Sequence, residues 1–439
     1  MTPDQAARTL GATLAHLGIA ETALLGPSHT IARLPVRTGG PASLPRISID
    51  LSGAKPRSAE LSSDSDLVAQ RELGRGGMGV VHLAQQRSLG RDVAVKTTLS
   101  SDATMAGALV REARVMGSLE HPNLVPVHAL GVDADGAPVL VMKRVEGVSW
   151  RALLADAAHE GWAPLLVGHG DPLRANVEIL THVCRALAFA HDRGVVHRDL
   201  KPENVMIGRF GEVYLLDWGV ALRLSERGSE PAAIVGTPGY LAPEMAHAKA
   251  DLIDARTDVY LLGSTLYEVL TGRMPHEAPT PLAAIVIALT GDIAPLPSDA
   301  PSELADLVRH AMAVEREDRI ATVEAFREGL ARFLSSREVD RAVTEARATL
   351  ARAKASIAND GPDSLDAFRA LIEARIVFIA AHRSRPRENV IVYLGGLVVI
   401  LAVPDWTAVL VVPHTALVLF VWWRALRIHA ARSAAIKAP

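Results

Sequence analysis

The feature that most constrains this chain is a change in the spacing of its apolar residues. From Leu67 to about Ser100, apolar and polar residues alternate, as in the segments 80–83 and 93–95, which is typical of antiparallel strands. From Leu173 onward the apolar residues recur at helical spacing. A strand-rich part followed by a helix-rich part predicts an α+β protein of two lobes. Helices are expected at 105–119, 177–192, 257–270, 282–289, 302–313 and 322–334.

The length and charge of the chain limit its class. At roughly 100 to 200 residues per domain, its 439 residues exclude a single small domain. The 46 Lys and Arg residues nearly balance the 49 Asp and Glu residues, so we expect no basic surface that attracts nucleic acid. The single cysteine, Cys184, allows no internal disulfide, which suits a reducing compartment.

A glycine-rich segment lies in the predicted strands. Gly74, Gly76 and Gly79, followed by Val81, form the pattern G-x-G-x-x-G-x-V. The same glycine spacing opens dinucleotide-binding units, but there a helix follows. Here a strand-like segment follows, so the pattern favours a hairpin that folds over a nucleotide. Glycine suits such a hairpin because it has no Cβ to hold the backbone away from phosphates.

A lysine in the next strand requires a partner. Lys96 follows Val93-Ala94-Val95, and an unpaired ammonium among apolar neighbours is costly. Glu112, in the predicted helix 105–119, is the expected partner. The alternative is that Lys96 extends to solvent and Glu112 lies on a solvated helix face.

Three further motifs follow in order. They are His197-Arg198-Asp199-Leu200-Lys201-Pro202-Glu203-Asn204, Leu215-Leu216-Asp217-Trp218-Gly219 and Ala242-Pro243-Glu244. Together with the glycine-rich segment and Lys96, this part of the chain resembles a bacterial serine/threonine protein kinase of the eukaryotic-like (Hanks) type. The resemblance covers residues 66–334. It implies the bilobal kinase fold, with a β-rich N-lobe and an α-helical C-lobe.

The resemblance also implies roles for individual residues. Asp199 accepts the proton of the attacking hydroxyl, Asn204 and Asp217 hold Mg²⁺ (or Mn²⁺), and Lys201 contacts the transferred phosphoryl group. The catalytic residues implied in this way are Asp199, Lys201, Lys96, Glu112 and Asn204. The ATP site is implied to include Gly74, Gly76, Gly79, Val81, Ala94, Lys96, Met142 and Val145.

Three structural contacts follow from the same resemblance. Thr237, in the platform for the acceptor peptide, is expected to bond toward the catalytic aspartate and the lysine two residues after it. Glu244 is expected to pair with Arg319. Asp258 is expected to anchor the backbone of the catalytic loop.

Two positions concern regulation. Arg198 precedes the catalytic aspartate, and the resemblance implies that it pairs with a phosphate on the activation loop, on Ser225 or Ser229. The alternative is that both serines are only solvated. Trp218 replaces the phenylalanine usual after the metal-binding aspartate, and we expect its larger ring to fill the same apolar pocket beside His197.

The segments that flank the kinase-like part carry weaker patterns. Residues 1–65 show a weak helical pattern followed by a linker rich in Pro, Gly and Ser. In 337–382, apolar residues from Val339 to Ile357 follow a heptad seam, which predicts a helical hairpin or a coiled coil that pairs two copies.

The segment 389–423 is almost wholly apolar. Pro404-Asp405 divides it into two halves, each near the length that spans a bilayer, and arginines flank both ends. We expect a transmembrane helical hairpin with both ends in the cytoplasm. A single tilted span, a re-entrant loop and a buried element of a soluble protein are the alternatives.

These observations predict a membrane-attached serine/threonine protein kinase in signalling. It is expected to transfer the γ-phosphoryl group of Mg-ATP to Ser or Thr hydroxyls of proteins, at the bacterial cytoplasmic membrane with the kinase domain facing the cytoplasm. The expected partners are ATP, protein substrates, the membrane and a second copy of the chain, with no nucleic acid. The alternative is a pseudokinase scaffold that binds nucleotide or partners without turnover.

Overall fold

The computed structural model describes residues 2–17, 44–50, 65–76, 79–99, 102–229, 233–360, 390–394 and 397–401. The chain divides into two compact units, Met1–Leu334 and Ser335–Pro439. Most of the expected linker, the expected helix near 365–379 and the second half of the apolar tail lie outside the described residues.

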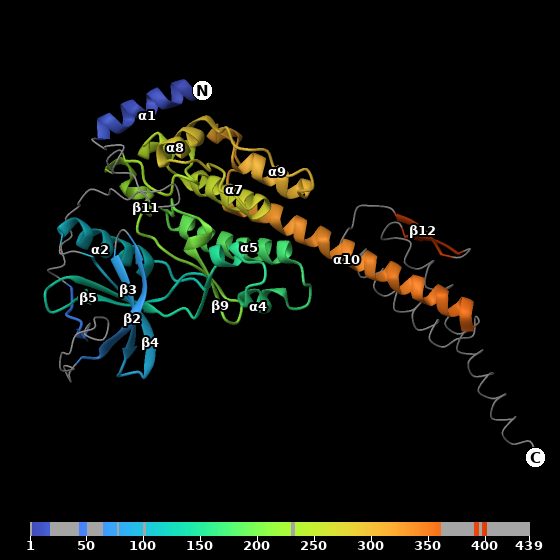
Figure 1. The fold of residues 1–439 in the computed structure, drawn as a ribbon, viewed down its shortest axis with the longest axis horizontal. Helices are drawn as coiled ribbons and strands as arrows, with labels where there is room; N and C mark the ends of the chain where they lie inside the picture. The colour runs from blue at the N-terminus through green and yellow to red at the C-terminus, as the bar shows by residue number, and fades with distance from the viewer. Residues whose placement is uncertain are drawn as a thin grey trace, which may run out of the picture. The chain divides into compact units, whose positions relative to one another are not determined.

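A six-stranded sheet forms the first lobe (Figure 1). Its order is β1-β2-β3-β4-β6-β5, and every neighbouring pair except β1 and β2 is antiparallel. The strands are β1 (Ile49–Asp50), β2 (Leu67–Gly76), β3 (Gly79–Gln86), β4 (Arg91–Thr97), β5 (Val127–Val132) and β6 (Pro138–Lys143). The alternating pattern of residues 67–100 therefore predicted strands β2, β3 and β4 of this lobe.

Helix α2 (Ala103–Gly117) packs against β5 and β6 of this sheet. It begins at Asp102, whose side chain accepts a hydrogen bond from the backbone N–H of Thr104. Its buried face consists of Leu109, Val110, Glu112, Ala113, Val115 and Met116. A carboxylate on an otherwise apolar buried face requires a specific partner in the sheet.

The opposite face of the sheet has its own small core. Its buried residues are Leu67, Ala84, Val93, Val95, Val139 and Val141. Ile47 and Ile49, from the segment before β2, pack against this core. Side chains alternate between faces along a strand, so Val93 and Val95 lie here while Ala94 and Lys96 face the other way.

Residues 45–50 connect the two edges of the sheet. At one edge, the backbone N–H of Ile47 donates to Val132 and the N–H of Val132 donates to Pro45, at 2.8 and 2.9 Å. At the other edge, Ile49 pairs with Leu67. These residues are therefore part of the folded lobe and not of the linker expected there.

Helices dominate the second lobe, as predicted. They are α3 (Trp150–Ala155), α4 (Ala163–Leu166), α5 (Pro172–Asp192), α6 (Pro243–Ala246), α7 (Ala255–Thr271), α8 (Pro281–Thr290) and α9 (Ser302–Ala311). Short strands accompany them: β7 (Gly147–Ser149), β8 (Val195–Val196), β9 (Val205–Gly208), β10 (Val213–Leu215) and β11 (Leu222–Arg223).

Helix α7 is the centre of this lobe. Every residue from Thr257 to Glu268 is buried. A capping box of Asp254 and Thr257 closes its first turn, and Gly272, with φ 72°, ends it. Polar side chains within this buried stretch need partners inside the protein, which positions α7 to hold the surrounding loops.

The first helix of the chain, α1 (Pro3–Leu17), lies against α8 in Figure 1, and residues of the two helices are in contact. Ala6, Leu10 and Leu14 of α1 belong to the main hydrophobic core. The weak helical pattern of the first residues therefore forms a helix that is packed on the second lobe.

Helix α10 (Val323–Asp360) is longer than expected. The sequence predicted one helix that ends at 334 and another that begins near 337, but a single helix of 38 residues runs through both. No Gly or Pro occurs between Leu330 and Asp360, so nothing in the local sequence breaks the helix.

Two antiparallel strands, β12 (Val390–Leu394) and β13 (Leu397–Leu401), occupy the described part of the apolar tail. The helical conformation expected for these ten residues is therefore wrong. Both strands are rich in Val and Ile, which favour strands. Among the helices that the structure describes, none has both the length and the apolar character required to cross a membrane.

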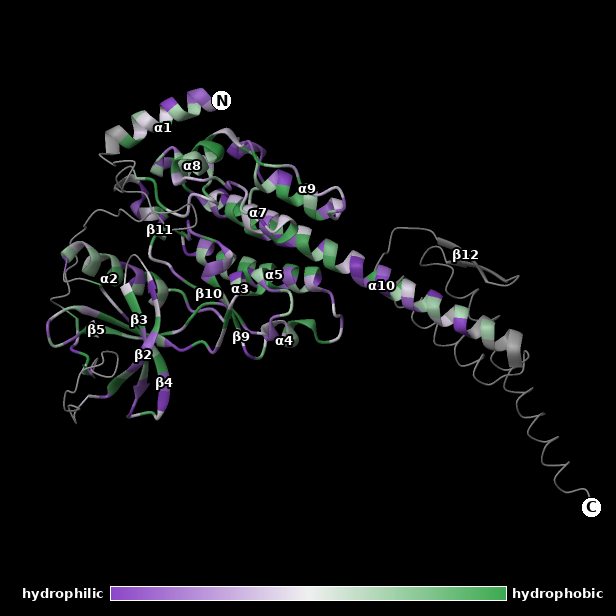
Figure 2. Ribbon diagram, viewed as in Figure 1, coloured by the Kyte–Doolittle hydropathy of each residue, from purple (hydrophilic) through white to green (hydrophobic). Residues whose placement is uncertain are grey.

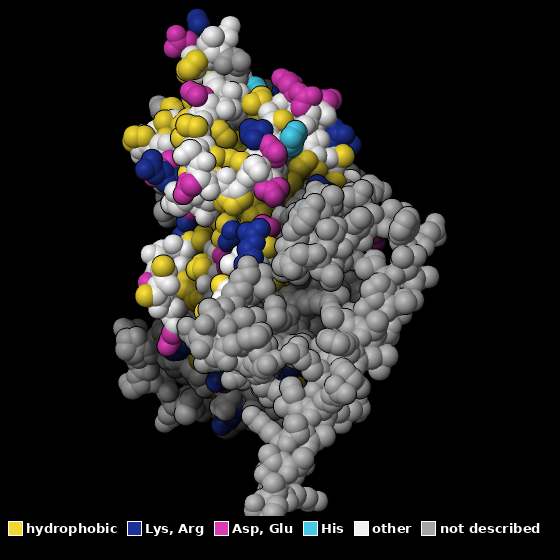
Figure 3. Space-filling view, turned by 90° about the vertical axis from the view of Figure 1, so that its right-hand side faces the viewer, with side chains coloured by type: hydrophobic (Ala, Val, Ile, Leu, Met, Phe, Trp, Pro, Cys, Tyr) yellow, Lys and Arg dark blue, Asp and Glu magenta, His cyan; other side chains and the backbone are white. Residues whose placement is uncertain are grey.

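The charged side chains are dispersed on the described part of the face in Figure 3. Acidic, basic and hydrophobic side chains are intermingled there.

Candidate active site

The ion pair expected between strand and helix is present. Lys96 of β4 donates to both carboxylate oxygens of Glu112 in α2, at 2.6 and 2.7 Å. The two side chains are 12% and 4% exposed, so the pair is largely removed from water. Burial alone would lower the pKa of Lys96, but the carboxylates of Glu112 and Asp217 raise it above its ordinary value. Lys96 therefore remains a cation.

The sheet register places the expected ATP-site residues around this lysine. Val81 of β3 pairs with Lys96, and Ala94 pairs with Met142 of β6. Residues directly opposite in an antiparallel pair share a face, and so do positions two apart along a strand. Val81, Ala94, Met142 and Lys96 therefore lie on one face. Val145, in the loop after β6, is partly buried and packs against the main core.

The glycine-rich hairpin joins β2 and β3. Gly76 pairs with Gly79, and Gly77-Met78 lie outside the described residues. A Cβ on Gly79 would lie 2.3 Å from the carbonyl oxygen of Thr97, so the fold itself requires glycine there. A Cβ on Gly74 or Gly76 would meet no atom within 4 Å. Among the described residues no atom stands where a side chain at Gly74 or Gly76 would begin, and this open space suits the close approach of a ligand.

Helix α7 anchors the catalytic loop. The backbone N–H groups of His197 and Arg198 donate to the two carboxylate oxygens of Asp258, at 2.8 and 3.0 Å. His191 lies 2.7 Å from the same carboxylate. Burial would raise the pKa of Asp258, but the hydrogen bond and charge of His191 and the loop N–H groups lower it. The carboxylate thus holds Arg198 at φ 68°, a conformation that non-glycine residues rarely adopt.

Three buried side chains form the centre of the site. The Thr237 hydroxyl donates to Asp199 at 2.6 Å and accepts from the Lys201 ammonium at 2.7 Å. The Lys201 Nζ atom is also 3.5 Å from the Asp199 carboxylate. These contacts join the catalytic loop to the segment 236–240, which was expected to receive an acceptor peptide.

Asn204 and Asp217 are brought together by the β9–β10 hairpin. Leu215 pairs with Val205, and the N–H of Leu216 donates to the Asn204 carbonyl at 2.7 Å, so Asp217 follows directly beside Asn204. The Asn204 side-chain amide donates to the Asp199 backbone carbonyl and carboxylate, at 2.7 and 3.1 Å. Asn204 is therefore in contact with Asp199 and adjacent to Asp217.

The charge of Asp217 is stabilised by cations from both lobes. Burial would raise its pKa, but the nearby charges of Lys96, His197 and Lys201, with the N–H of Gly219, lower it. Lys96 belongs to the first lobe and Lys201 to the second. Asp217 is thus an ionised carboxylate on which lysines of both lobes act.

The donor atoms of this cluster suit a hard divalent cation. The carboxylate of Asp217 and the amide oxygen of Asn204 are ligand types that Mg²⁺ prefers. Within the described ranges, no group of three or more His, Cys, Asp or Glu side chains has a metal-binding arrangement. A metal held by Asn204 and Asp217 would therefore need further oxygen ligands, such as those of a bound phosphate.

Trp218 lies where its larger ring was expected to fit. It is 2% exposed, and its ring meets the His197 ring edge to face, with centroids 4.6 Å apart. His197 in turn lies 3.0 Å from the Leu216 carbonyl. The replacement for phenylalanine therefore contributes to the packing beneath the catalytic loop.

The activation-loop serines lie in a short 3₁₀ helix, Leu224–Ser229. Ser225 is exposed. Arg198 is buried and its Nε atom donates to the Val220 carbonyl at 2.6 Å. Phosphorylation of Ser225 or Ser229 opposite Arg198 stays a prediction.

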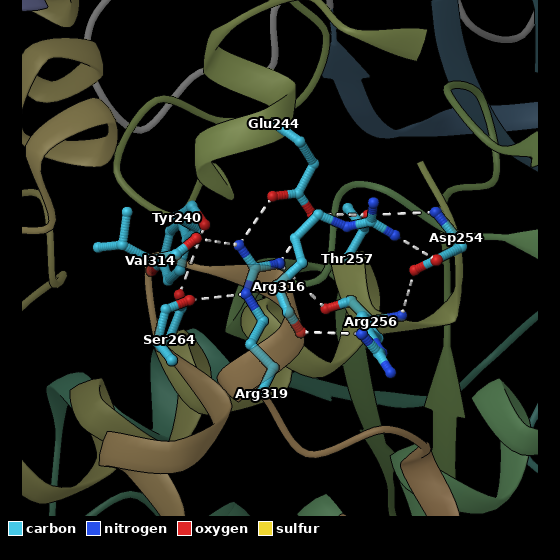
Figure 4. A network of polar contacts seen from close by, with 10 residues as sticks. Tyr240, Glu244, Asp254, Arg256, Thr257, Ser264, Val314, Arg316 and Arg319 are labelled. Atoms are coloured by element: carbon cyan, nitrogen blue, oxygen red, sulfur yellow. Dashed lines mark hydrogen bonds and ion pairs between the residues drawn. The ribbon is translucent and has the colours of Figure 1, made fainter. Parts of the chain in front are cut away.

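Figure 4 shows the contacts that hold the end of the activation segment. Arg319 forms a bidentate pair with Glu244, with both N–O distances 2.8 Å, and the Thr257 hydroxyl donates to the same carboxylate at 2.8 Å. A second pair, Arg316 with Asp254, lies beside it. Glu244 and Arg319 are 3% and 4% exposed, so this pair belongs to the core.

The sequence did not reveal one network. Arg151 of α3 donates to Glu203 at 2.8 Å and to Glu268 of α7, and it also contacts Tyr240. The Tyr240 hydroxyl donates to Glu268 at 2.6 Å. Arg151 and Glu268 are 117 residues apart, and no local pattern links them. Through Tyr240, the network joins the segment 236–240 to α3 and α7.

A strand-rich lobe with a glycine hairpin and a buried Lys–Glu pair, joined to a helical lobe that carries Asp199, Asn204 and Asp217, defines a protein kinase. Residues 67–330 match the family model described as protein kinase domain. That match covers more than half of the chain, and the chain belongs to this family.

The proteins similar to this chain include bacterial serine/threonine-protein kinases. The chain is 37% identical over 306 residues to serine/threonine-protein kinase PknB of Mycobacterium tuberculosis. The aligned region covers 66% of this chain and 46% of that protein. It is 38% identical over 273 residues to PknB of Mycolicibacterium smegmatis, covering 59% and 41%. It is 40% identical over 220 residues to a probable serine/threonine-protein kinase of Streptomyces coelicolor, covering 48% and 31%. The chain spans less than half the length of these relatives.

Proposed function

We propose that this chain is a serine/threonine protein kinase that transfers the γ-phosphoryl group of ATP to Ser or Thr hydroxyls of proteins. The observation that carries the proposal is that the Asp217 carboxylate interacts with both Lys96, the paired lysine of the first lobe, and Lys201, which belongs to the buried cluster with Asp199 and Thr237. The similarity to relatives named serine/threonine-protein kinases supports the choice of acceptor.

Each side chain has a defined task in this proposal. Lys96, held by Glu112, neutralises phosphate oxygens of ATP. Asp199 accepts the proton of the attacking hydroxyl, and Lys201 stabilises negative charge on the transferred group. Thr237, bonded to both, keeps the platform in register with them. Asn204 also orients Asp199 through its amide group.

Asn204 and Asp217 would hold Mg²⁺. When bound, the ion supplies neutralisation of the phosphate charge. The low pKa of Asp217 keeps its carboxylate ionised at neutral pH, which is the form that binds a cation.

The proposal is tested with the full chain, labelled ATP and Mg²⁺. The variant Asp199→Asn should lose at least about 100-fold in label transfer because it removes the proton acceptor. Asp192→Asn, at a side chain that is 83% exposed, is the matched control and should retain full transfer. Label on phosphoserine or phosphothreonine is expected; equal transfer by the Asp199 variant would favour a scaffold.

We further propose that the chain is attached to the cytoplasmic membrane through 389–423. The support is the apolar composition of this segment and the arginines on both sides of it. Sedimentation with lipid vesicles is the test: the full chain should pellet, and a chain that ends at residue 388 should stay in the supernatant. Equal pelleting of both would remove the proposal.

Pairing of two copies through α10 is a separate proposal. Of the seam positions, Val339 and Ala346 are already buried within a single chain. Pairing through these two residues would therefore require that they first become exposed. Sedimentation velocity should show dimers that Val343→Glu dissociates. Monomers at all concentrations would exclude this pairing.

A further inference from the structure

Helix α1 buries one narrow stripe of side chains. Ala6, Leu10 and Leu14 are 0%, 1% and 6% exposed and lie at positions i, i+4 and i+8, on one face of the helix. On the other side Gln5 and Ala12 are exposed. The stripe is part of the main hydrophobic core, and α1 contacts α8.

Helix α8 is apolar on every side. No residue from Pro281 to Thr290 is exposed, and Figure 2 colours α8 mostly as hydrophobic. A helix that is apolar on every side is stable in water only when other elements pack against every side. Helix α6 contacts it, and α1 contacts it as well. If α1 left, α8 would present an apolar face to water.

Helix α1 is a weak helix by itself. It has 15 residues, a length at which isolated helices are marginal in water. Gly11 is exposed within it and lowers its helix propensity. The Thr13 hydroxyl bonds back to the Thr9 carbonyl, which also does not favour a helix. The buried stripe is therefore what keeps α1 folded, and folding and docking are coupled.

The connection between α1 and the first lobe is long. The residues from 18 to 43 separate α1 from the segment that joins the sheet edges. A chain of that length can extend to at most roughly 90 Å, and the covalent connection favours docking of α1 on its own α8 over docking on another copy.

We propose that the face of α8 covered by α1 is a docking surface for a protein partner, and that α1 is its resident occupant. The partner presents an amphipathic helix with Ala or Leu at i, i+4 and i+8, because α1 itself shows that this pattern fits the surface. Docking displaces α1. Since α8 contacts α6, which begins three residues after Tyr240, the partner lies one helix from the acceptor platform.

The test compares three full-length proteins: the unaltered chain, a release variant and a control. The release variant is Leu10→Asp with Leu14→Asp, which places charge in the buried stripe. The control is Gln5→Asp with Ala12→Asp, which places the same charge on the exposed side of α1, away from the stripe. The probe is a labelled peptide of residues 1–17, and binding is followed by fluorescence anisotropy.

The release variant should bind the peptide at least about 100-fold more tightly than the unaltered chain or the control, because the tethered α1 no longer competes. A second peptide that keeps the residues of the stripe and replaces the others with polar helix formers should bind the release variant comparably. Equal binding of the first peptide by release variant and control would overturn the proposal, and so would failure of the second peptide.

Two measurements distinguish the release of α1 from unfolding of the two lobes. Cooperative thermal unfolding of the release variant shows that the lobes are still folded. In the unaltered chain, amide hydrogens of α1 should exchange at least about 100-fold faster than those of α7, as a releasable helix requires. Equal protection of the α1 and α7 amide hydrogens would show that α1 is a permanent part of the fold, and this result would overturn the proposal.

Sedimentation velocity covers one further case. If the unaltered chain is a dimer and the release variant a monomer, α1 docks on a second copy, and the proposed arrangement within one chain is wrong. None of these measurements depends on phosphoryl transfer, so their outcome is independent of the proposed function.

Discussion

At the scale of single residues, the buried Lys96–Glu112 pair combines chemistry with stability. Each charge is costly to bury alone, and each is tolerated because the other lies within 2.7 Å. The pair also sets Lys96 beside the ionised Asp217. Removing one charge therefore has two separable consequences, one for stability and one for transfer.

Lys96→Met should lower the free energy of unfolding by about 3 to 5 kcal/mol, because it leaves Glu112 buried without a cation. The double variant Lys96→Met with Glu112→Leu should regain most of this stability and still transfer no phosphate. Urea unfolding and label transfer measure the two effects. A double variant as unstable as the single one would contradict the argument.

His276 is a second residue with a predictable titration. It is fully buried, with Tyr260 at 3.1 Å and the Pro238 carbonyl at 3.3 Å, and burial lowers its pKa from 6.5 to about 4. The unfolded state therefore binds more protons than the folded state between about pH 6.5 and pH 4. The stability that depends on neutral His276 is complete above pH 6.5 and is lost as the pH falls through this window.

Unfolding of the unaltered chain and of His276→Gln should be compared between pH 7 and pH 4. The difference in free energy of unfolding between them should change by about 3 kcal/mol across this range, with the unaltered chain losing more. A constant difference would show that His276 does not carry this dependence.

At the scale of elements, close approaches decide which segments join the fold. The short segment 45–50 reaches β5 only because Gly131 has no side chain: a Cβ there would lie 2.4 Å from the Pro45 carbonyl and 2.5 Å from Ile47. Its two isoleucines then complete the small core beneath the sheet. Residues 45–50, which the sequence assigned to a linker, are thus part of the first lobe.

Gly131→Ala should lower the stability of the chain by about 1 to 3 kcal/mol, since backbone atoms must move to admit the methyl group. Gly107→Ala, inside α2 where a Cβ meets no atom within 4 Å, should instead raise it by about 0.5 to 1 kcal/mol. Chemical denaturation measures both changes. Equal effects of the two substitutions would show that residues 45–50 are not held in this way.

At the scale of the whole molecule, contacts between distant parts of the sequence hold the catalytic unit together. Glu244 and Arg319 are 75 residues apart and form a buried bidentate pair. Asp258 of α7 holds the catalytic loop from 61 residues away. Asp258 accepts from backbone N–H groups of the loop, and Arg319 donates to the backbone carbonyl groups of Ala313 and Val314 as well as to Glu244.

Arg319→Met should therefore lower the free energy of unfolding by about 3 to 5 kcal/mol, because Glu244 is left buried and unpaired. The KM for ATP should change less than about twofold at a temperature where the variant is folded. Thermal unfolding and initial rates provide the two values. A large rise in KM with unchanged stability would place Arg319 in the nucleotide site instead.

The sequence by itself determined the features that depend on neighbouring residues. The alternation of apolar residues predicted the strands of the first lobe, and the motifs around Lys96, Asp199 and Asp217 predicted which side chains gather at the site. The contact of Thr237 with Asp199 and the Glu244–Arg319 pair were also expected, from resemblance. These signals are short and local, or they recur in fixed order along the chain.

Only the tertiary structure decided which distant segments meet. The Arg151 network, the closure of the sheet by residues 45–50, the docking of α1 on α8 and the strands at 390–401 were absent from the sequence argument or differed from it. Each depends on packing between residues far apart, or on the choice between helix and strand in a uniformly apolar segment. Such contacts stabilise the protein only once the core has formed, so no local sequence pattern predicts them.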